Sequence, residues 1–156
     1  MNKSHREAMV EQEHEVAEVI AQFLADTYVL YVKTQNFHWN VVDPRFFFLH
    51  KMFEEQYENL AEATDLLAEQ MRSLKFRALG SMKQFLSHAS LEESEGDLSA
   101  DEMLHELVND HQKMMKDLGT AIEEIQNKDQ GAADLLIERL RFHEKTAWML
   151  RSHLQR

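Results

Sequence analysis

Residues 38–69 read HWNVVDPRFFFLHKMFEEQYENLAEATDLLAE. This stretch places two histidines and several acidic residues around the only proline of the chain. Pro44 has a fixed φ and no N–H to donate, which suits the first turn of a helix, and Asp43 before it is a good N-cap residue. We therefore expect one helix to end near Asn40 and a second to begin at Pro44. His38 and His50 then lie on either side of the junction and can approach one point.

The second helix is expected to carry two separate faces. At 100° per residue its apolar face consists of Leu49, Phe53, Leu60, Leu67, Met71 and Leu74. A polar face, roughly 130° away by the same periodicity, consists of His50, Glu54, Ala61, Asp65, Ala68 and Glu69. The polar face should point toward solvent or another subunit.

Distance along this helix limits which side chains can meet. With a rise of 1.5 Å per residue, His50 and Glu54 are about 6 Å apart, whereas His50 and Asp65 are about 22 Å apart. One chain cannot gather both ends of the face. Two antiparallel copies that cross near Leu60 about a two-fold axis would form two identical sites. Each site would combine His38, His50 and Glu54 of one chain with Asp65 and Glu69 of the other.

Two imidazoles with three carboxylates suit iron, manganese or zinc better than calcium or magnesium. A solvated helix face is the competing interpretation, because Asp and Glu make up 28 of 156 residues and acidic pairs at four-residue spacing arise by chance. Spacing alone favours that interpretation. His38 and His50 would then be interface histidines whose hydrogen bonds are satisfied.

Four motifs carry a resemblance to a known family. The chain resembles the Dps family of miniferritins (DNA protection during starvation) in these motifs. They are KTQNFHWNV (33–41), FFFLHKMFEEQY (46–57), LAEATDLLAEQ (60–70) and HEKTAWMLRS (143–152). The resemblance implies a ferroxidase centre between subunits. Its ligands would be His38, His50 and Glu54 of one chain and Asp65 and Glu69 of the other, with Trp39 and Trp148 nearby. The chain departs from the family pattern at Asp43, where Gly is usual, and at Gln70, where Arg is usual. Glu54 stands where Asp and Glu both occur.

The resemblance also implies a function and an assembly. Fe(II) would bind at the shared sites, with zinc or manganese as competitors, and hydrogen peroxide would oxidise it. A hollow shell of twelve subunits would store the ferric oxide and so protect DNA. Asp134 matches a carboxylate of the family's acidic three-fold pore. A solvated Asp in the first turn of a helix, stabilised by the helix dipole, is the alternative for Asp134.

The remaining sequence predicts an all-α fold within one domain, residues 1–156. One Pro and four Gly favour long helices, which we place at about 5–40, 44–77, 100–127 and 131–155. Capping boxes are expected at Ser4–Glu7 and Ser99–Glu102. The connector 81–98 should contain a short helical turn. Four helices with one long connector between the second and third predict a ferritin-like four-helix bundle with a crossover.

Composition bears on location and chemistry. No segment has the length and apolarity of a membrane span or a signal-peptide core, so we expect a cytoplasmic protein, with nucleoid association left open. Without cysteine, a metal site must use His and carboxylate. A formal charge of −11 and the lack of a Lys-rich tail argue against direct DNA binding.

Three alternatives to a shared iron site remain open from the sequence. An intra-bundle di-metal enzyme would use Glu-x-x-His pairs, which occur at Glu11–His14 and Glu102–His105. A nucleoid protein would bind DNA through bridging cations. A helical interaction protein would bind no metal, and its acidic faces would only keep it in solution.

Overall fold

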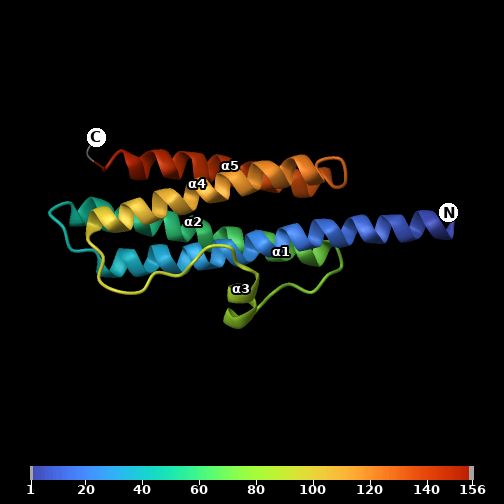
Figure 1. The fold of residues 1–156 in the computed structure, drawn as a ribbon, viewed down its shortest axis with the longest axis horizontal. Coiled ribbons are helices and arrows are strands. Elements are labelled where there is room, and N and C mark those ends of the chain that lie inside the picture. The colour runs from blue at the N-terminus through green and yellow to red at the C-terminus, as the bar shows by residue number, and fades with distance from the viewer. Residues whose placement is uncertain (1, 155–156) are drawn as a thin grey trace.

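The structure, a computed structural model, describes residues 2–154, and they form five helices (Figure 1). These are α1 (Lys3–Asn40), α2 (Phe46–Ser73), α3 (Met82–His88), α4 (Ala100–Ile125) and α5 (Gln130–Arg151). The predicted all-α ferritin-like bundle with a crossover is confirmed. The expected helical turn in the crossover is the seven-residue helix α3.

Two antiparallel pairs make up the bundle. α1 packs along α2, α4 packs along α5, and the crossover that carries α3 runs along α1 before it reaches α4 (Figure 1). The first turns of α1 project beyond the other helices at the N-terminal end. The α1–α2 junction therefore lies at the opposite end, beside the start of α4 and the end of α5.

The predicted apolar face of α2 is confirmed. Leu49, Phe53, Leu60 and Leu67 are fully buried and Met71 nearly so, while Leu74 packs against the core from its edge. They meet the apolar faces of α1, α4 and α5 in one core. Burial of a Leu or Phe side chain contributes about 1.5–3 kcal/mol. This face therefore fixes the rotation of α2 and leaves its polar face outside the core.

Both ends of α2 differ from the prediction. α2 begins at Phe46, not Pro44, because Pro44 and Arg45 form a turn closed by the Phe46 N–H and the Asp43 carbonyl, 2.9 Å apart. At the other end α2 stops at Ser73, because Lys75 adopts φ 70°. The N–H of Phe76 donates to the Met71 carbonyl at 3.1 Å, a Schellman closure that usually has Gly at the left-handed position. The prediction that α2 runs to residue 77 was wrong.

The other ends are closer to the prediction. The Ser99–Glu102 capping box is confirmed, with both reciprocal hydrogen bonds present. The box at Ser4–Glu7 does not form, because α1 begins at Lys3 and Ser4 lies inside the helix. α4 ends two residues before the predicted position. α5 begins at Gln130 after the N-cap Asp129 and ends at Arg151, whereas the predicted end at 155 lies outside the described residues.

A buried carboxylate fixes the crossover to α1. Asp26, which is fully buried, accepts hydrogen bonds from the N–H of Ser90 at 2.6 Å and of Leu91 at 2.9 Å, and from the Ser90 hydroxyl at 2.8 Å. Lys113 of α4 donates to the same hydroxyl at 2.9 Å. These bonds satisfy backbone donors that the crossover would otherwise leave without a partner.

Replacement of this carboxylate should loosen the crossover. Asp26→Ala leaves the N–H groups of Ser90 and Leu91 unpaired and should lower the free energy of unfolding by about 2–4 kcal/mol. Urea denaturation measures this loss, and hydrogen exchange should show both amides losing protection. Asp97→Ala, at an exposed crossover position, is the matched control. Equal stability of the two variants would contradict this role of Asp26.

Candidate metal centre at the helix junction

His38 and His50 meet face to face where α1 ends and α2 begins. Their rings are stacked with centroids 3.8 Å apart. The Nδ1 of His38 lies 2.7 Å from the carbonyl oxygen of His50, and the Nδ1 of His50 lies 2.8 Å from the carbonyl oxygen of His38. A carbonyl only accepts hydrogen bonds, so each Nδ1 carries a proton and each Nε2 is the nitrogen left for a metal. The pair thus offers two Nε2 atoms as nitrogen ligands, with the Nδ1–H of each ring held by a carbonyl.

Aromatic rings surround the histidine pair. Phe46 stacks on His50 at 4.9 Å between centroids, and Tyr57 meets the His38 ring edge-on at 5.1 Å. His38 is only 6% exposed. This packing restricts rotation of the imidazoles and holds their Nε2 atoms in place.

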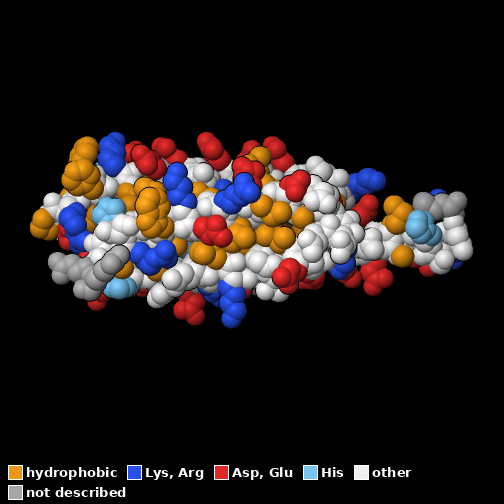
Figure 2. All heavy atoms as spheres, turned by 90° about the horizontal axis from the view of Figure 1, so that it is seen from above, with side chains coloured by type: hydrophobic (Ala, Val, Ile, Leu, Met, Phe, Trp, Pro, Cys, Tyr) orange, Lys and Arg blue, Asp and Glu red, His pale blue; other side chains and the backbone are white. Residues whose placement is uncertain are grey.

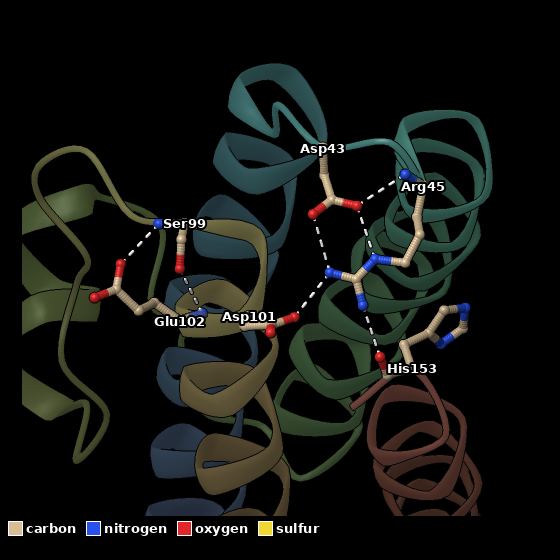
Figure 3. A network of polar contacts seen from close by, with 6 residues as sticks. All are labelled: Asp43, Arg45, Ser99, Asp101, Glu102 and His153. Carbon is tan, nitrogen blue, oxygen red and sulfur yellow. Dashed lines mark hydrogen bonds and ion pairs between the residues drawn. The ribbon is translucent and has the colours of Figure 1, made fainter. Parts of the chain in front are cut away.

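Arg45 holds the junction in position (Figure 3). Its guanidinium donates to Asp43 at 2.7 and 3.0 Å, to Asp101 of α4 at 2.8 Å and to the His153 carbonyl beyond α5 at 2.7 Å. Hydrogen bonds from the Arg45 side chain and backbone lower the pKa of Asp43 to about 2. Asp43, at the position where the Dps pattern has Gly, therefore serves as a charged partner for Arg45 within this network.

Glu54 lies one turn beyond His50 on α2. Its carboxylate accepts a hydrogen bond from the Lys51 ammonium at 3.1 Å, and this bond lowers the pKa of Glu54 below its ordinary value. Glu54 is therefore ionised. To bind a metal beside the histidines, the carboxylate would have to give up part of this contact.

Asp65 and Glu69 lie further along α2, and both are exposed. Neither forms an ion pair with another residue in the part of the chain that the structure describes. Residues 2–154 contain no group of three or more His, Asp or Glu side chains that could hold a metal ion within one chain. Of the five predicted ligands, the structure thus brings together only His38 and His50.

The two tryptophans expected near the site lie on the surface of the single chain. Trp39 is 65% and Trp148 is 59% exposed, and Phe47 and Phe48 are exposed beside the junction. Figure 2 shows hydrophobic side chains gathered at the end of the molecule opposite the projecting start of α1. The metal-binding prediction and an exposed apolar surface therefore coincide at this end.

The intra-bundle alternative is not supported by the structure. Glu102 is used in the capping box of α4, while Glu11 and His14 lie at the far, projecting end of α1. The only buried carboxylate among residues 2–154 is Asp26, which the crossover occupies.

Sequence reasoning missed what the bundle interior does contain. His111 of α4 and His143 of α5 are fully buried, with their Nδ1 atoms 2.7 Å apart, and Arg139 is buried close by. One signal was available. His111 falls on the apolar stripe of its helix, between Leu107 and Met114, where a histidine must be buried.

Comparisons with known proteins agree with the fold. The model of the ferritin-like domain family matches residues 17–156. DNA protection during starvation protein 2 of Bacillus anthracis is 36% identical over 90% of this chain and 97% of its own length. The crystal structure of a Dps protein from Bacillus brevis superposes with a TM-score of 0.89 and 35% identity, and covers 99% of this chain and 100% of that one.

A third relative bears on the metal chemistry. The Dps protein of Vibrio cholerae O1, a member of a broad superfamily of ferritin-like diiron-carboxylate proteins, has a TM-score of 0.89 and 28% identity over 94% of this chain and 92% of its own. Within residues 2–154, no helix has the length and apolarity to cross a membrane. The motifs, the crossover bundle and these relatives together show that the chain belongs to the Dps family of ferritin-like proteins.

Proposed function

We propose that this protein is a ferroxidase that oxidises Fe(II) and stores the ferric product. The observation that carries the proposal is the reciprocal pairing of His38 and His50. In this pairing each Nδ1–H is used by a carbonyl, so each Nε2 remains for a metal. Neutral imidazole and carboxylate suit Fe(II), and they also suit Mn(II) and Zn(II), which we expect to compete. The diiron-carboxylate superfamily of the Vibrio cholerae relative supports iron.

Each site is proposed to be shared between two chains. Asp65 and Glu69 are exposed and form no ion pair within residues 2–154, and α2 is a continuous helix that keeps Asp65 about 22 Å from His50 along its axis. A second chain related by a two-fold axis can bring its own Asp65 and Glu69 to His38, His50 and Glu54. The exposed aromatic residues at the junction would be covered in such a dimer. Six dimers in a shell of twelve subunits would then enclose a cavity for ferric oxide.

The ligands account for the direction of the chemistry. Carboxylates stabilise Fe(III) more than Fe(II), because the attraction grows with the charge of the ion. Two Fe(II) ions supply the two electrons that reduce one hydrogen peroxide to two hydroxide ions. Since this reaction consumes Fe(II) and peroxide without releasing a radical, it would protect DNA from both reactants.

Mixing two inactive variants tests the shared site. One double variant carries His38→Ala and His50→Ala, and the other carries Asp65→Asn and Glu69→Gln. Each should lack Fe(II) oxidation when it is assembled alone, because every site loses two ligands. After co-refolding, half of randomly paired dimers are mixed, and each has one intact site of two. Activity should therefore return to about a quarter of wild type. Peroxide-dependent Fe(II) oxidation, followed by the absorbance of Fe(III), measures the recovery.

Two controls make this experiment decisive. Glu58→Gln with Glu62→Gln, on exposed positions of α2 outside the ligand set, should keep full activity. Each inactive variant refolded alone must show the helical circular dichroism and the assembly size of the wild type. A mixture that assembles normally and remains inactive would show that the site is not shared in this way.

Asp134 is proposed to line the three-fold pore through which Fe(II) enters the shell. It is exposed in the first turns of α5, where Gln130 donates to its Oδ1 at 3.5 Å. Asp134→Asn should slow Fe(II) uptake into the shell and leave the number of Fe(II) ions bound per subunit unchanged. Stopped-flow oxidation and anaerobic titration measure the two quantities. Glu144→Gln, at an exposed position later on α5, is the control, and equal uptake rates in both variants would remove Asp134 from the pathway.

A further inference from the structure

The interior of the bundle holds a buried positive charge that pairs with no carboxylate among the described residues. Arg139 of α5 is 6% exposed, and its Nη1 donates to the Asn59 amide oxygen of α2 at 2.8 Å. Its Nε and Nη2 are buried and have no hydrogen-bond partner in the part of the chain that the structure describes. Burial lowers the pKa of Arg139 to about 10, which leaves the guanidinium charged at neutral pH.

The other buried charges of the described chain are compensated. The Lys33 ammonium lies 2.8 Å from Asp110, and Asp26 accepts three hydrogen bonds from the crossover. No carboxylate lies within ion-pair distance of Arg139 among residues 2–154. A buried charge with no partner is strongly unfavourable, so a compensating group is expected at this position.

Two imidazoles lie beside this guanidinium. The Phe142 ring is the common neighbour, because the Arg139 guanidinium carbon lies 4.4 Å from its centroid, and the rings of His111 and His143 meet it edge-on at 6.1 and 5.2 Å. Burial lowers the pKa of His111 to about 3 and that of His143 well below its ordinary value, so both are neutral. Their Nδ1 atoms share one hydrogen bond, and both Nε2 atoms have no partner.

The unpartnered groups are mostly donors. One Nδ1 must donate to the other, so one imidazole keeps an Nε2–H and the other keeps a bare Nε2. Arg139 adds the N–H groups of Nε and Nη2. Gln56, buried one turn before Asn59 on the same side of α2, has no partner for its amide nitrogen or oxygen. A water molecule could donate to the bare Nε2 and to the Gln56 oxygen, but it would leave the guanidinium charge uncompensated, whereas an anion neutralises it.

We propose that Arg139, His111, His143 and Gln56 form a binding site for a small monovalent inorganic anion, such as chloride, inside the bundle. The anion neutralises the guanidinium and accepts hydrogen bonds from Nε and Nη2 of Arg139, from the imidazole Nε2–H and from the Gln56 amide. It links α2, α4 and α5 at the middle of the bundle. The site is separate from the His38–His50 centre, and it binds an anion where that centre would bind a metal cation.

Thermal unfolding in chloride tests the proposal. With iron-free protein at constant sodium concentration and ionic strength, replacement of gluconate by chloride should raise the unfolding midpoint in step with the logarithm of chloride concentration, because chloride binds the folded state. Arg139→Gln should abolish this chloride-dependent shift. Arg141→Gln, at an exposed position of the same helix, should retain it. Equal midpoints in chloride and gluconate for the wild type would overturn the proposal.

Bromide gives a second measurement that needs no variant. Crystals of the wild-type protein grown in bromide should show an anomalous peak within hydrogen-bond distance of Nε and Nη2 of Arg139. Density without an anomalous signal at that position would mean that water alone fills the site, and bromide found only at the surface would also refute the proposal. Neither measurement involves iron, so failure here leaves the ferroxidase proposal unaffected.

Discussion

The reciprocal hydrogen bonds between His38 and His50 join the end of one helix to the start of the next. Carbonyl groups in the last turn of a helix have no intrahelical donor, and the His38 carbonyl is one of these. The His50 ring supplies the missing donor, and the His38 ring returns a bond to the His50 carbonyl. The bonds that stabilise the turn are therefore also the bonds that set the tautomer of both imidazoles. The same atoms thus satisfy the helix end and orient the imidazoles for the metal binding that we propose.

The position of this junction depends on contacts from the second helix pair. Arg45 connects the turn to Asp101 at the start of α4 and to the His153 carbonyl after α5, so both helix pairs meet at the candidate site. Asp43 takes part in the same network. A glycine at that position could give the turn its shape but could not pair with the guanidinium.

The charge distribution separates two chemistries within one bundle. The outer face of α2 presents Glu54, Asp65 and Glu69, and His50 near its start stacks on His38, a set of groups that favours cations. The interior between α2, α4 and α5 contains a guanidinium and two imidazoles without a carboxylate, which disfavours cations and favours an anion. The proposed metal site therefore lies on the outer surface of the bundle, where a second chain can supply the ligands that one chain lacks.

Much of the fold could be predicted from the sequence, because its signals are local. The apolar periodicity of α2, the Ser99–Glu102 capping box and the long connector depend on residues a few positions apart, and all three are confirmed. The boundaries that were wrong involve competition between local signals. Lys75 takes a conformation that usually indicates Gly, since the Schellman hydrogen bonds outweigh its cost. Ser4 loses its capping role because α1 begins at Lys3, two residues before the predicted start.

The sequence by itself determined the helices, the crossover and the approach of His38 to His50, since these follow from periodicity and from a proline at one junction. Only the tertiary structure decided that each Nδ1 bonds the opposite carbonyl, that Arg45 joins the junction to α4 and α5, and that His111, His143 and Arg139 share the interior. These contacts join residues on different helices. Their partners depend on how each helix is rotated in the bundle, and burial of all the apolar faces together sets that rotation.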